Sequence, residues 1–261
     1  MLIAFGVSRV VKRYAVIDVF WGAGFFVIFA VSLWVSYLFS CSSSHPWWNV
    51  GPGVATARWS LLAVVALWSL RLSFYLAVRQ RGTSEDSRYV MILRGAKGRN
   101  ETLYALRTIF LLQAMLLWFI SWPLQFVAYA SSFNPIISWI AVGVVVVGVS
   151  FESIGDLQLR RFLATPANKG TTMNRGLWRY SRHPNYFGDA VVWWGIYLGA
   201  LSTGWGALTI LSPLLMNRLL TSVSGKPLLE GKLTKTRSGY EEYVATTSAF
   251  FPRRPRRRPD S

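Results

Sequence analysis

The sequence predicts an all-α, polytopic membrane protein of about six to seven transmembrane helices, with cytoplasmic loops that close a cleft. Hydrophobic residues make up 52% of the 261-residue chain, and its mean hydropathy is +0.34. Long apolar runs recur along the chain, and most of the 28 Lys and Arg residues lie between them. This pattern is typical of a protein embedded in a bilayer rather than of a soluble one.

Six apolar runs predict the spans. They cover residues 16–39, 59–78, 109–130, 136–150, 190–201 and 208–220. The last two runs are short, and we expect the Gly-rich turn at residues 202–206 to join them as a hairpin. A seventh span is expected if residues 2–11 also enter the membrane.

The basic residues predict the orientation of these spans. With six spans, the basic groups at residues 9–13, 79–107, 160–182 and after residue 218 all fall on one side. The positive-inside rule assigns that side to the cytoplasm, so both termini are expected there. The acidic residues lie on the same side, whereas a transporter needs polar groups along its whole path. The sequence therefore favours an enzyme or a binding protein with a cytoplasmic mouth.

The composition and the motifs exclude a disulfide and several common ligand sites. A single cysteine excludes a disulfide within the chain, and two histidines with one cysteine do not form a usual metal site. There is no Walker loop. Gly22 and Gly24 lie inside the first apolar run without a flanking strand, so we interpret them as helix-packing residues and not as a dinucleotide fingerprint.

The net charge of +17 follows largely from topology and does not indicate nucleic-acid binding. We divide the chain into a transmembrane domain at residues 1–252, with its cofactor-binding part at about 150–252, and a basic tail at residues 253–261. The tail is expected to contact anionic lipid headgroups.

A row of charged residues ends the fourth apolar run. Glu152, Asp156 and Arg160 are spaced i, i+4 and i+8, so they share one face of a helix. They would either bind ribose hydroxyls or an amide, with Arg160 or Arg161 near phosphate, or form an intrahelical ion pair that anchors the helix end. The sequence leaves both interpretations open.

The segment at residues 176–194 carries the strongest functional signal. Arg175, Arg179, Arg182 and His183 precede Pro184, which favours the first turn of a helix. Free backbone amides at that turn, together with the preceding bases, suit an anion. Asn185 and Asp189 follow one turn apart, on one face, next to Tyr186. We predict a binding site at the cytoplasmic end of this helix.

The second apolar run contains Arg71, about two turns from its cytoplasmic end. An arginine at that depth requires an acidic partner or a bound anion. Asp18, near the start of the first run, lies at a similar depth. A structural Asp18–Arg71 pair and a ligand site are both open interpretations.

Together these residues resemble the steroid 5-alpha-reductase-like superfamily of membrane enzymes, and within it a bacterial branch. The matching segments are residues 17–22, 67–72, 81–89, 151–162, 176–194, 224–230 and 239–252. The resemblance implies a multi-pass protein of the bacterial plasma membrane that encloses NADPH and transfers hydride to a carbon–carbon double bond of a lipid.

The resemblance also implies roles for individual residues. The residues implied to line the cofactor pocket are Arg71, Asp156, Asn185, Arg218 and Glu230. Arg179, Arg182 and His183 would lie at its phosphate end, and Asp189 near the nicotinamide. We assign Tyr186 and Asp189 as proton donors, and Glu152 and Arg160 to the cofactor.

The substrate side departs from the pattern of steroid reductases. Trp68 stands where those enzymes have a tyrosine that polarises the substrate ketone, and Glu152 replaces an amide residue. We assign Asp18, Trp21, Trp68 and Tyr89 to the substrate and expect a hydrophobic lipid or steroid-like acceptor.

Two alternatives remain open. The superfamily is similar to isoprenylcysteine-type methyltransferases, which share the Arg-His-Pro-x-Tyr-x-Gly element, so the second hypothesis is a lipid methyltransferase that uses S-adenosylmethionine. The third is a non-catalytic lipid-binding membrane protein.

Overall fold

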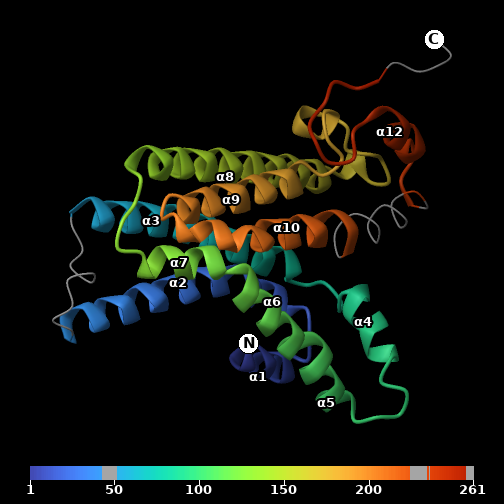
Figure 1. The fold of residues 1–261 in the computed structure, drawn as a ribbon. Helices are drawn as coiled ribbons and strands as arrows, with labels where there is room; N and C mark the ends of the chain where they lie inside the picture. The colour runs from blue at the N-terminus through green and yellow to red at the C-terminus, as the bar shows by residue number, and fades with distance from the viewer. Residues whose placement is uncertain (43–51, 224–233, 235, 257–261) are drawn as a thin grey trace. The chain divides into compact units, whose positions relative to one another are not determined.

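A computed structural model describes residues 1–42, 52–223, 234 and 236–256 of the chain (Figure 1). Within these residues every regular element is a helix, and one isolated β-bridge joins Thr171 to Ser238. The chain forms two compact units. The first comprises residues 1–135 and 200–209, and the second comprises residues 136–199 and 210–261.

The first unit contains most of the N-terminal helices. They are α1 (Leu2–Val11), α2 (Val16–Ser42), α3 (Pro52–Gln80), α4 (Ser87–Arg94), α5 (Glu101–Ala105), the π-helix η2 (Leu106–Leu111), α6 (Leu112–Ile120), α7 (Trp122–Tyr129) and the 3₁₀-helix η5 (Trp205–Ile210).

Small residues bring α2 and α3 together. A Cβ atom at Gly22 would lie 2.6 Å from Ser73 Oγ. The hydroxyl of Ser69 donates a hydrogen bond to the carbonyl of Gly22 over 2.8 Å, and the hydroxyl of Ser73 donates to the carbonyl of Val19 over 2.9 Å. Gly22 is therefore a helix-packing residue, as predicted, because only a hydrogen fits at this contact.

The second unit is built around two long helices. Its elements are α8 (Pro135–Ala164), the 3₁₀-helices η3 (Pro166–Asn168) and η4 (Gly176–Arg179), α9 (Pro184–Leu201), α10 (Leu211–Arg218), the π-helix η6 (Leu219–Val223) and α12 (Tyr240–Thr246). The predicted helix start at Pro184 is confirmed.

Helices α8 and α9 run antiparallel and very close together (Figure 1). A Cβ atom at Gly148 would lie 2.8 Å from the carbonyl oxygen of Gly188, and one at Gly188 would lie 2.5 Å from the backbone nitrogen of Glu152. Farther along, Gly195 leaves the same small gap to the backbone of Val145. Gly188 and Gly195 lie seven residues apart on α9, so both contacts fall on one face of that helix.

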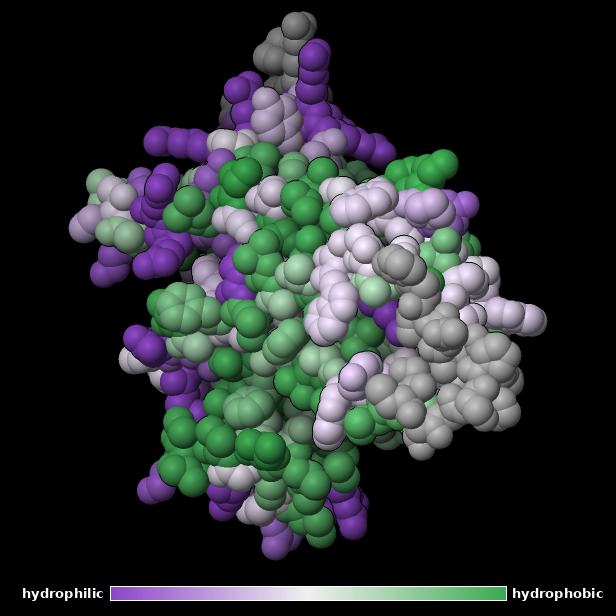
Figure 2. Space-filling view, turned by 90° about the vertical axis from the view of Figure 1, so that its left-hand side faces the viewer, coloured by the Kyte–Doolittle hydropathy of each residue, from purple (hydrophilic) through white to green (hydrophobic). Residues whose placement is uncertain are grey.

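Four helical segments are long and apolar enough to cross a membrane: Val16–Phe39, Gly53–Gln80, Glu101–Ile120 and Pro135–Ala164. Large apolar side chains such as Trp34, Phe74 and Trp139 are more than half exposed on three of these segments. Hydrophobic residues also cover much of the face drawn in Figure 2. These features define an α-helical membrane protein. The described residues of the predicted fifth and sixth spans lie in α9 and in η5–α10–η6, which are not among the four segments.

The third predicted span has different bounds from those expected. The sequence suggested one run over residues 109–130, but the structure ends α6 at Ile120 and starts α7 at Trp122. Pro123 lies in the first turn of α7 and lacks the N–H needed to continue the earlier helix. The buried Ser121 accepts two backbone hydrogen bonds, from Leu124 and Gln125.

The α8–α9 contact yields a stability prediction. Replacing Gly188 by Ala places a methyl group against the backbone of Glu152, which cannot rotate away, and should destabilise the protein by roughly 1–3 kcal/mol. Gly143, also on α8, has open space around it, so Gly143→Ala should be neutral or stabilise by about 0.5–1 kcal/mol through helix propensity. Thermal unfolding in detergent measures both variants, and equal melting temperatures would contradict the prediction.

Candidate functional site

The predicted site residues divide between the two units. Those in the second unit are Glu152, Asp156, Arg160, Arg179, Arg182, His183, Asn185, Tyr186, Asp189 and Arg218. Those in the first unit are Asp18, Trp21, Trp68, Arg71 and Tyr89. Glu230 lies outside the described residues.

Two carboxylates of α8 are buried at its contact with α9. Glu152 and Asp156 lie one turn apart, and each residue is only 3% exposed. The side-chain amide of Asn185, in the first turn of α9, donates a hydrogen bond to Asp156 Oδ1 over 3.2 Å. The shared face of Glu152 and Asp156 is therefore confirmed, whereas Arg160, one turn farther along, is exposed.

The start of α9 gathers several predicted residues. The ring of His183 stacks on that of Tyr186, with centroids 5.4 Å apart and planes within 7°. One turn after Asn185, Asp189 is 8% exposed, and Trp193 on the next turn is fully buried. The face of α9 that carries Asn185 thus continues as polar and aromatic side chains away from solvent.

Arg182 makes contacts that its sequence context did not indicate. Its Nη1 donates to the carbonyl oxygens of Val244 and Thr247, over 2.9 and 2.8 Å, and its backbone N–H donates to the carbonyl of Ser248. Val244 and Thr247 lie at the C-terminal end of α12, where helix carbonyls lack intrahelical partners. Arg182 therefore stabilises the packing of α12 through a buried cation at the negative end of the helix dipole.

Tyr243, on α12, binds the loop that precedes α9. Its hydroxyl donates to the carbonyl oxygens of Trp178 and Ser181, which belong to the loop between α8 and α9. The indole Nε1 of Trp178 donates to the carbonyl of Gly155 over 3.0 Å. Tyr243 and Trp178 thus connect α12, the loop and α8. We call the loop at residues 165–183 together with residues 236–256 the cap.

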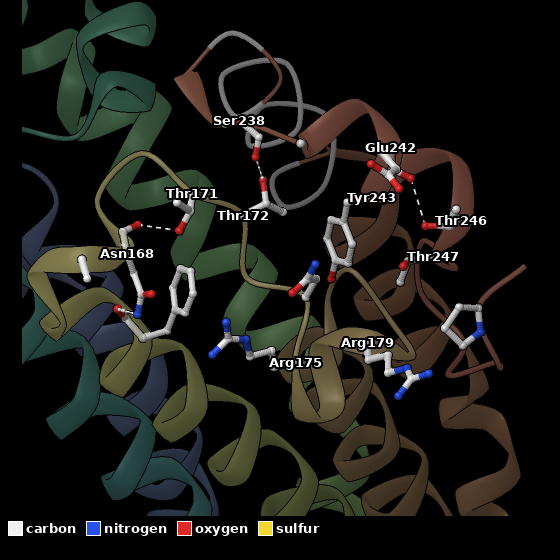
Figure 3. A pocket seen from close by; sticks show the side chains of 15 residues that line it. Asn168, Thr171, Thr172, Arg175, Arg179, Ser238, Glu242, Tyr243, Thr246 and Thr247 are labelled. Carbon is white, nitrogen blue, oxygen red and sulfur yellow. Dashed lines mark hydrogen bonds between the residues drawn. The ribbon is translucent and has the colours of Figure 1, made fainter. Parts of the chain in front are cut away.

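Residues of the cap, together with Phe162 of α8, line a half-open cavity of about 620 Å³ (Figure 3). Its lining residues are Phe162, Ala167, Asn168, Thr171, Thr172, Asn174, Arg175, Arg179, Ser238, Gly239, Glu242, Tyr243, Thr246, Thr247 and Pro255. Figure 3 shows the two arginines along one side and Glu242 across from them. Hydroxyl and amide groups supply most of the remaining wall, so the cavity offers both cationic and neutral hydrogen-bonding groups.

Local geometry positions the two arginines. Between them, Gly176 has φ +57°, a backbone conformation that residues with a Cβ rarely adopt. The next backbone N–H, that of Leu177, donates to Gln158 Oε1 of α8 over 2.9 Å. This bond and the Trp178–Gly155 bond fix η4 on α8, and η4 in turn presents Arg175 and Arg179 at the cavity.

Sequence reasoning missed the C-terminal wall of this cavity. Ser238 pairs with Thr171 in a β-bridge, its carbonyl accepts from the hydroxyl of Thr172, and its N–H donates to the carbonyl of Gly170. These partners lie about 66 residues apart in the chain. No periodic pattern predicts such a pairing, although the resemblance included residues 239–252.

In the first unit, Asp18 has partners other than the expected Arg71. Arg88 Nη2 binds Asp18 Oδ2 over 2.8 Å and Asp86 Oδ2 over 2.9 Å. The hydroxyl of Tyr89 donates to Asp18 Oδ1. Sequence depth suggested Arg71, but the loop after α3 brings Arg88 and Tyr89 to the start of α2.

The other predicted substrate residues form an aromatic group near Asp18. Trp21 follows Asp18 by about one turn of α2, and its ring contacts Phe25 edge-on at 5.6 Å. Phe25 stacks on the fully buried Trp68 at 5.8 Å. The first unit therefore places Trp21 and Trp68 around Phe25, about two turns of α2 from the carboxylate that binds Tyr89.

Charged neighbours within this cluster shift the pKa values of Asp86 and Tyr89. Burial would raise the pKa of Asp86, but its hydrogen bonds with Arg88 and the charge of that guanidinium outweigh burial and hold this pKa below its usual value. Burial and the neighbouring charge of Asp18 raise the pKa of Tyr89. At neutral pH the cluster therefore contains an ionised Asp86 and a neutral Tyr89 hydroxyl.

The fold and site define an α-helical membrane protein with buried helix carboxylates and a cationic cap cavity. The chain belongs to the family described as protein of unknown function (DUF1295), whose model matches residues 4–247. This family is associated with steroid 5-alpha-reductase-like membrane proteins. No curated protein and no solved structure matches the chain.

The depressed pKa of Asp86 predicts a pH effect on stability. A carboxyl group with a lowered pKa stabilises the fold above its unfolded pKa of about 4, and this contribution is lost as pH falls through the folded value. Asp86→Asn retains the side-chain acceptor that caps α4 but cannot titrate. The melting temperature of the wild type should therefore exceed that of the variant at pH 7, and the two should converge toward pH 3. A constant difference would contradict the assignment.

Proposed function

We propose that the protein is a membrane-embedded reductase that uses NADPH and transfers hydride to a carbon–carbon double bond of a hydrophobic lipid or steroid-like substrate. The proposal combines the family membership with the chemistry of the second unit. The single observation that carries it is the continuity of α8. One membrane helix bears buried carboxylates on its face and ends at a cavity lined by arginines.

The spacing along α8 suits an extended ligand. Asp156 is bound to Asn185, and six residues later Phe162 lines the cavity. Six residues of α-helix rise by about 9 Å. A dinucleotide carries its phosphates, ribose hydroxyls and carboxamide along one extended molecule, so both polar regions of α8 lie within its reach.

The donor and acceptor groups also fit NADPH. Arg175 and Arg179 would bind phosphate oxygens, because guanidinium groups match phosphate geometry. Carboxylates accept hydrogen bonds from ribose hydroxyls, which suits Glu242 in the cavity and Asp156 on α8. Asn185 offers an amide to a carboxamide, since its Nδ2 already donates to Asp156 and its carbonyl oxygen can accept.

The proposed chemistry requires hydride on one carbon of the double bond and a proton on the other. NADPH supplies the hydride when it is bound. Tyr186 and Asp189 are the proposed proton donors, because both project from the first two turns of α9. Burial of Asp189 and Trp193 keeps water away from that face, which protects the hydride from side reactions.

Two observations favour the reductase over the alternatives. S-adenosylmethionine carries no phosphate, so a methyltransferase leaves Arg175 and Arg179 without a ligand group. A non-catalytic lipid-binding protein does not need Glu152 and Asp156 sealed at a helix contact, where ionisable groups are costly. A phosphate-bearing cofactor accounts for both the arginines and the carboxylates.

Ligand-induced stabilisation tests the cofactor. NADPH at about 100 times its dissociation constant should stabilise the detergent-purified protein by roughly 2.7 kcal/mol against unfolding. Arg175→Ala with Arg179→Ala should abolish the shift in melting temperature at the same concentration, because each removes a proposed phosphate contact. Arg99→Ala removes an exposed arginine that does not line the cavity, so it should retain the shift.

The outcomes of this experiment separate the three hypotheses. A shift with S-adenosylmethionine but not with NADPH would overturn the reductase in favour of the methyltransferase. The absence of a shift with either compound would favour the lipid-binding protein. A shift with NADPH that survives in the double arginine variant would place the cofactor outside the cap cavity.

Replacement of the proposed proton donor tests the chemistry. Asp189→Asn keeps the size of the side chain and should keep the NADPH shift, but it should lower turnover about 10²- to 10⁴-fold, as expected for loss of general acid catalysis. The assay follows NADPH consumption with a panel of unsaturated membrane lipids. Glu241→Gln, which alters an exposed carboxylate, serves as the control and should leave turnover unchanged. Full turnover in Asp189→Asn excludes this residue as donor.

A further inference from the structure

The C-terminal segment at residues 248–256, which we call the strap, is tied to the cap by its backbone. The hydroxyl of Ser181 donates to the carbonyl of Phe250 over 2.8 Å. The N–H of Arg253 donates to the carbonyl of Tyr180 over 3.0 Å, and the N–H of Arg256 donates to the carbonyl of Thr246 over 2.9 Å. The basic residues of the strap thus have a defined place in the fold, beyond the general electrostatic contact that their charge predicted.

A chain of aromatic contacts links the strap to the membrane helices. Phe151 of α8 contacts Phe187 of α9, with ring centroids 5.3 Å apart. Phe187 contacts both Phe250 and Phe251 of the strap, at 5.9 and 6.0 Å. The strap therefore lies beside the part of α8 that contains Phe151.

The sequence of α8 places that part near the membrane boundary. About 20 helical residues cross the hydrocarbon core, so a span that begins at Pro135 reaches the opposite boundary near residue 155. The first charged residue of α8, Glu152, comes directly after Phe151, in agreement with this estimate. Phe151, and with it the strap, lies within about one turn of the boundary.

The outer side of the strap has the composition of an interfacial segment. Phe251 is 60% exposed, and Tyr180, whose carbonyl accepts from the N–H of Arg253, is 41% exposed. Arg253, Arg254 and Arg256 follow, and all three are exposed. Aromatic rings at the level of the headgroups and arginines next to them are the pairing that binds an anionic membrane surface.

We propose that the strap is a lipid-binding surface in which Phe251 enters the bilayer interface and Arg253, Arg254 and Arg256 bind the phosphates of anionic phospholipids. The complementary charge and the position beside α8 identify the partner as the surface of the membrane in which the protein is embedded. This inference does not depend on the proposed reductase activity.

Depth-dependent quenching tests the proposal on the full chain. Phe251→Cys is introduced with Cys41→Ser, which removes the native cysteine, and is labelled with an environment-sensitive fluorophore. The protein is reconstituted in nanodiscs of phosphatidylcholine alone or of phosphatidylcholine with phosphatidylglycerol, each containing a lipid with a quencher near its headgroup. Quenching should be stronger with phosphatidylglycerol and should weaken at high salt.

Two further labelled variants test whether the quenching depends on the arginines and on the strap. Changing Arg253, Arg254 and Arg256 together to Gln in the labelled protein should abolish the increase caused by phosphatidylglycerol, because each arginine near an anionic surface contributes to binding. A label at Glu241→Cys, on the exposed face of α12, should show little quenching in either lipid.

Each other outcome overturns the proposal. Equal quenching at residue 251 in both lipid compositions would show that the arginines do not bind anionic headgroups. Weak quenching in both lipid compositions would show that the strap lies away from the bilayer. The arginines would then bind a soluble partner instead. Strong quenching at residue 241 as well shows that contact with the bilayer is not specific to the strap.

Discussion

The close approach of α8 and α9 is the contact on which the rest of the second unit depends. At Gly148 and Gly188 the two backbones leave no room for a methyl group, so the helices exclude lipid from the strip between them. Polar side chains in an apolar medium require protein partners. The strip provides them, because Gly188 lies directly against the backbone of Glu152 and Asn185 reaches Asp156. Bulkier residues in this strip would separate the helices and expose both carboxylates to hydrocarbon.

The cap continues this arrangement beyond the end of α8 through a small number of long-range bonds. Trp178 attaches the loop to α8, Tyr243 attaches α12 to the loop, and Arg182 closes the end of α12. All three use main-chain carbonyls as acceptors, so they fix the path of the backbone rather than the identity of neighbouring side chains. These bonds therefore fix the backbone around the cavity. Arg175 and Arg179 line the cavity, and both residues are exposed.

Sequence reasoning succeeded where the signal is local. Four of the six apolar runs overlap helices long enough to cross a membrane. Pro184 gave the start of α9, and the spacing of Glu152 and Asp156 gave their common face. It was less successful where a contact joins distant segments, because hydrophobic periodicity reports the face of one helix and not its partner. Asp18 illustrates this: its depth suggested Arg71, yet α4, about 70 residues away in the chain, supplies Arg88 and Tyr89. Hydrophobic periodicity did not indicate the C-terminal wall of the cavity either, because that wall also forms through contacts between distant segments.

The arginines show that charge alone does not assign a role. Arg182 was grouped with Arg179 because both precede Pro184, yet Arg182 is buried against helix carbonyls while Arg179 lines a cavity. The strap adds a third environment, in which Arg254 and Arg256 are exposed but Pro255 between them belongs to the cavity wall. One short segment thus has an inner side that closes the polar cavity and an outer side that presents cations. A ligand bound to the outer side, as proposed for the membrane surface, would therefore also restrain the cavity wall through the backbone at Pro255.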